Sequence, residues 1–191
     1  MSGLKLITAP AEEPVTLAEA KLHCRVDGSA DDTLITALIA AARQQGEHRT
    51  GRAFVTQTWE LALDAFPESE IELPIVPAAS ITSVKYLDGN EVEQTISSAD
   101  YAIDSYGLRH WLIPSYGVSW PSTLDAANAV KVRYVAGYGA ASAVPEGIKA
   151  WILLAVGTLY QNREAVTQGQ TGEVPRDFFD GLLDPYRVYR L

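Results

Sequence analysis

The stretch TLAEAKLHCRVDGSADDTLITALIAAARQQGEHRTGR, residues 16–52, decides the fold class because it carries the start and stop signals of two helices. Thr16 and Glu19 have the spacing at which a threonine hydroxyl and a glutamate carboxylate cap each other's backbone amides. This capping box predicts a helix that starts at Leu17 and runs to about Arg25, before a turn.

A second, longer helix is expected in the same stretch. Ser29 precedes Asp32 by three residues, which provides a second possible cap. The apolar residues after it recur at helical spacing, and Gly51 lies where a left-handed residue most often ends a helix. We therefore expect one amphipathic helix that continues to Thr50. Its apolar stripe comprises Leu34, Ile35, Leu38, Ile39, Ala41 and Ala42.

From Phe54 onwards the apolar period changes from about four residues to two. Trp59, Leu61 and Leu63 alternate with polar or small residues, as on a strand with one buried face. Asp88-Gly89-Asn90 separates two strand-like runs and predicts a hairpin turn. Connections this short favour antiparallel pairing in a meander or a small sandwich. The candidate strands are residues 58–63, 71–73, 81–87, 91–96, 101–103, 108–113 and 130–135.

A second helical block spans residues 144–164. Pro145 suits the first turn of a helix, and Glu146 is favourable at the positive end of the helix dipole. The apolar stripe that follows is broad enough to imply burial on more than one side. It comprises Ile148, Trp151, Ile152, Ala155, Val156, Leu159 and Tyr160.

These patterns together predict an α+β chain. Residues 1–53 and 140–191 are expected to form a small helical bundle, and residues 54–139 an inserted antiparallel β subdomain. A chain of 191 residues is long enough for such a domain with a large insertion.

The net charge of −9 is concentrated in the strand-patterned block. Between Glu60 and Asp104, ten acidic residues are opposed by Lys85 alone, which equals the charge of the whole chain. A nucleic-acid reader needs basic side chains to replace the counterions on phosphates, so tight DNA binding is not expected. A solvated outer surface that keeps the protein soluble is the simplest interpretation.

Composition sets further bounds. Hydrophobic residues at 47% are ordinary for a globular protein, and no apolar run is long enough to cross a bilayer. The first ten residues lack the basic start and apolar core of a secretory signal, so export by that route is not expected. The single cysteine, Cys24, excludes an internal disulfide and fits a reducing compartment.

Catalytic and metal-binding patterns are weak. His23 and Cys24 are neighbours on a helix, where their side chains diverge by about a hundred degrees and cannot form a nucleophile–base pair. The sequence has no His-x-x-x-His or paired-cysteine spacing, so we expect no metal, no cofactor and no catalytic residue.

Several motifs, in this order, resemble the head-tail connector (adaptor, or head completion) proteins of tailed phages, in a longer subfamily with a β insertion. They cover nearly the whole chain. They are Thr16-Leu17-Ala18-Glu19-Ala20-Lys21, His23-Cys24-Arg25-Val26-Asp27, Thr50-Gly51-Arg52, Thr56-Gln57-Thr58-Trp59, Tyr134-Val135-Ala136-Gly137-Tyr138-Gly139, Leu159-Tyr160 and Leu183-Asp184-Pro185-Tyr186-Arg187.

The resemblance implies a non-enzymatic structural protein of the virion. Members of this family form a ring, commonly of twelve subunits in the virion, below the portal at the neck of the capsid, where DNA passes and the tail joins; in solution the chain could also be a monomer. The implied partners are other copies of the chain, the portal protein and a tail completion or stopper protein, while DNA passes without sequence-specific binding. The implied location is the virion neck, and the bacterial host cytoplasm during assembly; the gene can equally sit in a prophage.

Two sets of residues are candidates for contacts with partners. The broad stripe of the second helical block could bury its surplus apolar surface against a neighbouring subunit, or the strand block could cover it within one subunit. By family analogy the tail engages the portal, and it combines tyrosine and arginine, two residue types enriched at binding hot spots. The interface candidates are Ile148, Trp151, Ile152 and Leu159, and the tail candidates are Tyr186, Arg187, Tyr189 and Arg190.

Two other functions fit parts of the sequence. A β-sandwich binding module on a helical scaffold could recognise a glycan or a peptide, with Trp111, Tyr116 and Trp120 as a stacking platform. A carboxylate hydrolase would instead use acidic pairs that share a strand face. These pairs are Glu70 with Glu72 and Glu91 with Glu93.

Overall fold

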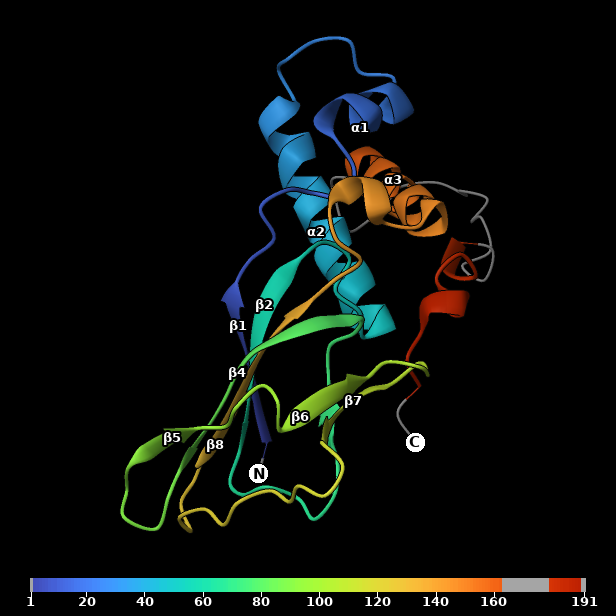
Figure 1. Ribbon diagram of the computed structural model, residues 1–191. Coiled ribbons are helices and arrows are strands. Elements are labelled where there is room, and N and C mark those ends of the chain that lie inside the picture. Colours follow the sequence, from blue (N-terminus) through green and yellow to red (C-terminus); the bar gives the residue numbers. More distant parts are fainter. Residues whose placement is uncertain (1, 163–178, 190–191) are drawn as a thin grey trace. The chain divides into compact units, whose positions relative to one another are not determined.

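The chain divides into two compact units in a computed structural model that describes residues 2–162 and 179–189 (Figure 1). One unit, here the strand unit, is Met1–Ala11 with Thr56–Tyr138, and the other, the helical unit, is Glu12–Val55 with Gly139–Leu191. The expected division placed the first eleven residues with the helices. They lie in the strand unit because Ser2–Thr8 forms a strand that pairs along residues 58–63.

Three helices form the described part of the helical unit: α1 (Leu17–Cys24), α2 (Asp32–Thr50) and α3 (Glu146–Gln161). The capping box at the start of α1 is confirmed. Glu19 N donates to Thr16 Oγ1 at 3.2 Å, and Thr16 N donates to Glu19 Oε2 at 2.7 Å. Arg25 then ends α1 in a left-handed conformation with a φ of 57°.

The two ends of α2 differ in how they are stabilised. The possible cap at Ser29 is not used, because α2 begins after Asp31, whose side chain makes no capping bond to the helix. The Asp31 carboxylate instead accepts a hydrogen bond from the hydroxyl of Tyr160 on α3. The C-terminal end is as expected: Gly51 is left-handed with a φ of 69°, and its N–H donates to Glu47 O at 2.9 Å.

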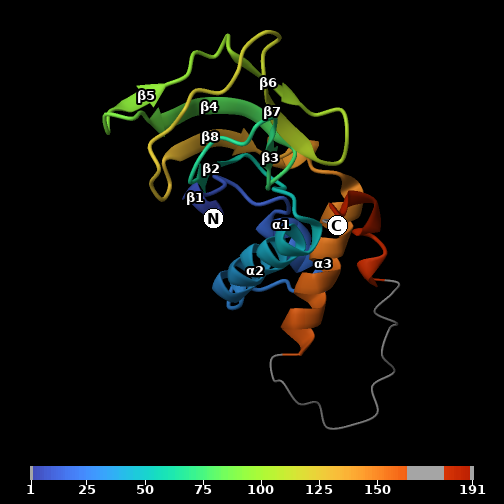
Figure 2. The same cartoon turned by 90° about the horizontal axis from the view of Figure 1, so that it is seen from below.

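Five antiparallel strands build the larger sheet of the strand unit, in the order β1-β2-β8-β4-β5. Figure 2 displays the strands side by side in this order. The strands are β1 (Ser2–Thr8), β2 (Gln57–Leu63), β8 (Val130–Ala136), β4 (Ala78–Leu87) and β5 (Glu93–Thr95). Burial alternates strictly along β8, so one face of the sheet lines the core and the other faces outward.

A second sheet of three antiparallel strands completes the strand unit: β3 (Ile71–Leu73), β7 (His110–Pro114) and β6 (Tyr101–Asp104), paired in that order. One hydrogen bond joins it to the larger sheet, and a second joins the segment after β3 to that sheet. Ala78 N donates to His110 Nδ1 at 3.0 Å, and Ile75 N donates to Tyr134 Oη at 3.0 Å. The α+β class with antiparallel strands is therefore confirmed.

The hairpin predicted at Asp88 joins β4 to β5, with Lys85 opposite Thr95. The Asp88 carboxylate organises the turn by accepting from the backbone N–H groups of Asn90 and Val92. A hydrogen bond from the Gln94 side chain, followed by those two backbone bonds, lowers the pKa of Asp88. The residue with positive φ is Glu91, at 63°, because this turn is one residue longer than a two-residue hairpin loop.

The core of the helical unit leaves no room beside Gly46 on α2. A methyl group at this position would lie 2.7 Å from Cε2 of Phe54 and 3.1 Å from Cζ3 of Trp151, and both aromatic side chains are fully buried. The missing side chain therefore lets two aromatic rings approach the helix backbone.

We expect Gly46→Ala to destabilise the protein. Beside two fully buried rings we expect overpacking to cost about 2–3 kcal/mol, which outweighs the roughly 1 kcal/mol that alanine contributes to helix propensity. Chemical denaturation should give a net loss of about 1–2 kcal/mol in the free energy of unfolding. The control is Gly28→Ala, which has no atom within 4 Å of the added methyl. Equal stability of the Gly46→Ala and wild-type proteins would contradict this packing account.

Candidate functional site: the C-terminal segment and its anchor on α2

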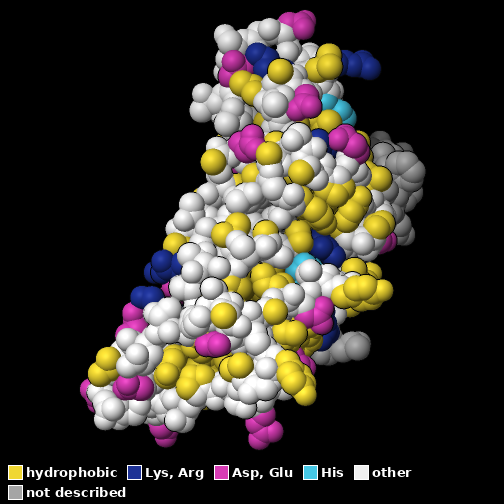
Figure 3. Space-filling view, in the orientation of Figure 1, with side chains coloured by type: hydrophobic (Ala, Val, Ile, Leu, Met, Phe, Trp, Pro, Cys, Tyr) yellow, Lys and Arg dark blue, Asp and Glu magenta, His cyan; other side chains and the backbone are white. Residues whose placement is uncertain are grey.

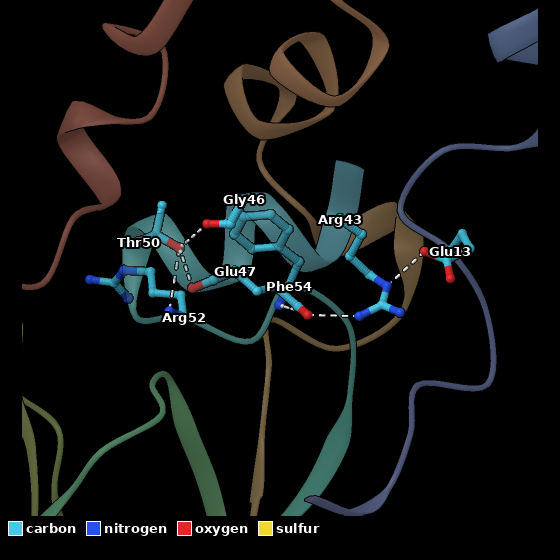
Figure 4. A network of polar contacts seen from close by, with 7 residues as sticks. All are labelled: Glu13, Arg43, Gly46, Glu47, Thr50, Arg52 and Phe54. Carbon is cyan, nitrogen blue, oxygen red and sulfur yellow. Dashed lines mark hydrogen bonds and ion pairs between the residues drawn. The ribbon is translucent and has the colours of Figure 1, made fainter. Parts of the chain in front are cut away.

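A buried arginine links α2 to the segment that precedes α1 (Figure 4). Arg43 Nε donates to Glu13 Oε2 at 2.7 Å, and its Nη1 donates to Glu47 Oε2 at 2.7 Å. The arginine is 7% exposed, so both ion pairs lie largely away from water. Burial alone would lower the pKa of Arg43, but the hydrogen bonds and charges of Glu13 and Glu47 raise it above its usual value.

The same network directs the chain as it leaves α2. The second oxygen of the Glu47 carboxylate accepts from Phe54 N at 2.9 Å. Thr50 Oγ1 donates to Gly46 O at 2.9 Å and accepts from Arg52 N at 3.3 Å. These bonds satisfy backbone groups at the helix end, so the turn over residues 50–54 is fixed from within the helical unit (Figure 4).

The C-terminal segment, residues 179–189 of the described chain, is attached to this turn. Val188 N donates to Thr50 O at 2.9 Å, and Arg52 Nε donates to the carbonyl oxygen of Tyr186 at 2.6 Å. Arg52 is only 8% exposed, so its guanidinium is committed to this contact. The backbone of the segment is therefore held against the end of α2 by two hydrogen bonds, one that it donates to Thr50 and one that it accepts from Arg52.

A second anchor lies one turn earlier on α2. Arg49 Nη1 pairs with Asp180 Oδ1 at 2.5 Å, and the Arg49 guanidinium lies 5.8 Å from the ring centre of Trp151. The Phe179 ring packs against the same indole, with ring centres 5.2 Å apart. Leu183 is fully buried. The segment is thus part of the helical core up to Tyr186.

The tail candidates differ in their availability to a partner. Tyr186 packs over Gly147, where an added methyl would lie 3.3 Å from the tyrosine hydroxyl. Arg187 pairs with Asp184 at 3.1 Å, at the short 3-10 turn η2 (Asp184–Tyr186). Tyr189 is 65% exposed, whereas Arg190 lies outside the described residues. Of the described candidates, Tyr189 presents the most surface.

The interface candidates on α3 are mostly internal. Ile148, Trp151 and Ile152 are fully buried within the chain, because α1 and α2 both pack on α3. They present no surface to a neighbouring subunit, so the broad apolar stripe is largely explained by the helical unit itself. Leu159, at 40% exposure, is the one candidate of the four that offers surface.

Only some of the contacts in this site could be expected from the spacing of residues in the sequence. Arg43 and Glu47 are four residues apart on a helix, a spacing at which ion pairs form. Glu13, Arg49 and Arg52 were not singled out, because each finds its partner far along the chain or on the backbone. No sequence pattern of a few residues reports such pairings.

The stacking platform of the alternative binding module is not assembled. The Trp120 indole stacks on Phe66 with ring centres 5.0 Å apart and donates to Ser69 O, so it packs within the strand unit. Tyr116 is fully exposed.

The carboxylate pairs of the alternative hydrolase are separately engaged or exposed. Glu93 pairs with Lys85 at 2.7 Å, and Glu72 lies 3.9 Å from Arg109. Among the described residues, no group of three or more His, Cys, Asp or Glu side chains could hold a metal ion, and no helix is long and apolar enough to cross a membrane.

Comparisons with known proteins point to one class. A family model described as "Phage gp6-like head-tail connector protein" matches residues 14–106. This match confirms the resemblance that the sequence motifs indicated. No match was found among curated proteins.

Solved structures match over nearly the whole chain. A chain from the "Neck of empty GTA particle computed with C6 symmetry" is 25% identical, with a TM-score of 0.82, covering 99% of this chain and 97% of that one. A chain from the "Virion of native gene transfer agent (GTA) particle" is 24% identical, with a TM-score of 0.80 and coverage of 98% and 96%. A third, from the "Neck of native GTA particle computed with C12 symmetry", is 23% identical, with a TM-score of 0.72 and coverage of 99% and 97%.

We expect Arg43→Met to be strongly destabilising, because it leaves two partly buried carboxylates without their shared cation. Loss of one partner from such a pair costs about 3 kcal/mol, which denaturant titration would measure. Arg25→Met, at an exposed arginine, is the control and should change the free energy of unfolding by less than about 0.5 kcal/mol. An equally small effect of both substitutions would show that the Arg43 network is dispensable.

Arg52→Met should loosen the tail while the helices stay folded. The methionine keeps the apolar volume but cannot donate to Tyr186 O, and a net hydrogen bond of about 1 kcal/mol corresponds to about fivefold faster opening. Hydrogen exchange at the Val188 amide is the measurement, with the amides of α2 as the internal reference. The control is Arg133→Met, a change in the strand unit, which should leave the exchange rate of the Val188 amide at its wild-type value. A wild-type exchange rate at Val188 in the Arg52→Met protein would show that Arg52 does not hold the segment.

Proposed function

We propose that this chain is a structural protein of the neck of a tailed-phage-like particle, where copies of it form a ring between the portal and the tail. The observation that carries this proposal is the full-length match to a neck chain at 25% identity and a TM-score of 0.82. The connector family model over residues 14–106 supports it independently.

The ring is the central part of the proposal. Neck structures that contain similar chains were computed with C6 and with C12 symmetry, and rings of twelve subunits are what the family resemblance implies. DNA passes through the opening without sequence-specific contacts, which agrees with a net charge of −9. The protein acts as a scaffold and not as an enzyme, first in the host cytoplasm during assembly and then in the virion neck.

Both units take part in the ring in this proposal. The helical unit contributes Leu159 to the surface that faces a neighbouring copy. The strand unit, residues 1–11 with residues 56–138, adds a further surface. The tail completion or stopper protein binds on the side of the ring away from the portal.

The tail engages the portal protein through its outermost residues. Tyr189 is 65% exposed, while Tyr186 and Arg187 are held within the helical unit. The partner therefore contacts Tyr189 and the Arg190 that follows it in the sequence, whereas Tyr186 and Arg187 hold the described segment against the helical unit.

The experiment is reconstitution with portal rings encoded beside this gene, followed by electron microscopy. We expect a ring of this chain stacked coaxially on the portal, with an open channel. Tyr189→Ala combined with Arg190→Ala should weaken capture by portal rings at least about tenfold, because tyrosine and arginine are the residue types enriched at binding hot spots.

The matched control is Tyr186→Phe, which keeps the ring packed over Gly147 and should bind the portal as the wild type does. Portal binding by single copies without a ring would contradict the neck function. Undiminished capture of the Tyr189→Ala, Arg190→Ala protein would refute the role of the tail and leave the ring proposal standing.

A further inference from the structure

The cations of the strand unit are gathered on one face of the larger sheet. The unit has five lysines and arginines, and all except Arg109 lie on the outer face of this sheet. Lys5 stands opposite Glu60, which stands opposite Arg133, and Lys131 stands opposite Lys85. Residues directly opposite each other share a face, so these side chains form one surface, here called the basic face.

Two of these cations have no carboxylate partner. Arg133 donates to Glu60 through Nε at 3.0 Å and Nη2 at 2.6 Å, and Lys85 pairs with Glu93 at 2.7 Å. Among the described residues, no carboxylate lies within ion-pair distance of Lys5 or Lys131, and both lysines are exposed. The hydrogen bond and charge of Lys85, and then the charge of Lys131, lower the pKa of Glu93. The basic face thus keeps two unpaired positive charges.

The arrangement is not the one that sheet stability favours. Lys85 and Lys131 are directly opposed on neighbouring strands, and like charges in this position are destabilising. Beside them the sheet has a register shift between Ile81 and Ser83, and a hollow of about 150 Å³ opens on the face. It is lined by Glu60, Ser83, Lys85, Glu93, Lys131 and Arg133.

The opposite charge is gathered at one end of the same sheet. Asp64 follows the last residue of β2, and Asp88 and Glu91 lie in the turn after β4. Asp125 is brought to this end because Leu124 N donates to Leu87 O and Asn128 N donates to Asp64 Oδ1. These four residues are here called the acidic end.

The loops of the acidic end supply no cation of their own, and of its four carboxylates Asp64 is offset by the N-terminal amino group, whose hydrogen bond lowers the pKa of Asp64. The connecting segments 64–70, 88–92 and 115–129 contain no lysine or arginine. Glu91 and Asp125 are exposed and Asp64 and Asp88 half-buried, and acidic side chains lie on the surface around the turn between β4 and β5 (Figure 3). The strand unit therefore carries two surfaces of opposite charge, one on the outer face of the sheet and the other at the end of its strands.

We infer that the basic face of one copy receives the acidic end of the next copy around the ring. This inference rests on the proposed ring. A ring needs a heterologous interface, in which two different surfaces of the same chain meet, because a surface that pairs with itself stops at a dimer. The strand unit supplies two such surfaces with complementary charge, and this complementarity selects the neighbour and its orientation.

The chemistry of the face favours a protein carboxylate over a nucleic-acid phosphate. Glu60 and Glu93 lie among the cations and leave only two positive charges uncommitted. A phosphate backbone, with its dense negative charge, would meet these carboxylates along its length. A few carboxylates on loops can instead approach Lys5 and Lys131 singly.

The test exchanges charge between the two surfaces. One variant carries Lys5→Glu with Lys131→Glu, and the other carries Glu91→Lys with Asp125→Lys, which avoids the carboxylates that hold turns. We expect each variant alone to need at least about tenfold more protein than the wild type to form rings in sedimentation velocity, because like charges then face each other. A one-to-one mixture should restore assembly, because the two reversed surfaces complement each other in alternating order.

The outcomes separate this inference from the proposed function. Wild-type rings with unaffected variants, or variants that the mixture does not rescue, would overturn the inference and leave the neck function standing. Failure of the wild type to form rings, alone or on portal rings, would overturn both. Arg25→Glu, a charge reversal in the helical unit, is the control and should assemble as the wild type does.

A second measurement needs no substitution. A zero-length carbodiimide joins a lysine amine only to a carboxylate in direct contact, and a mixture of ¹⁴N and ¹⁵N protein distinguishes links between copies. We expect links from Lys131 or Lys5 of one copy to Glu91 or Asp125 of another. Links between copies that avoid these residues, or DNA binding that the Lys5→Glu, Lys131→Glu protein loses, would contradict the inference.

Discussion

The helical unit depends on the buried ion pairs of Arg43. One guanidinium joins the segment before α1, through Glu13, to the last turns of α2, through Glu47. The other oxygen of Glu47 holds Phe54 N, and Phe54 fills the space that Gly46 leaves open against Trp151. A buried charge that lost its partners would be costly, so this network allows one path for the chain out of α2.

The C-terminal segment uses the turn that this network fixes. Thr50 offers its carbonyl to Val188, and Arg52 reaches the carbonyl of Tyr186. A partner that binds beyond Tyr186 is therefore coupled to the end of α2 through backbone hydrogen bonds. This connection fixes the path of the described segment from Tyr186 to Val188 along the end of α2.

Local signals in the sequence predicted the elements whose causes are local. The capping box of Thr16, the left-handed Gly51 and the hairpin at Asp88 each depend on a few neighbouring residues, and all three formed. Strand β1 was missed, because it lies at a sheet edge and keeps Leu4 and Leu6 about 40% exposed, so its sequence shows no buried face. Its register with β2 is a property of two distant segments.

The same limit applies to charge. The sequence located the acidic excess between Glu60 and Asp104, but strand order and register decide which side chains share a face. Only the pairing of β8 with both β2 and β4 brings Lys131 opposite Lys85 and Arg133 opposite Glu60. The sequence also did not reveal what covers the broad apolar stripe on α3. Ile148, Trp151 and Ile152 are buried within the chain itself, so no neighbouring subunit is needed to cover them.

The central claim is that copies of this chain close into a ring, and the particle mass tests it most directly. Light scattering of the chain over rising concentrations, alone and seeded with portal rings, measures how many 20.7 kDa copies assemble. The proposed ring predicts a plateau at a closed multiple, with about twelve copies added to each portal ring. A mass that stays at one copy, stops at two, or grows without a plateau would contradict it.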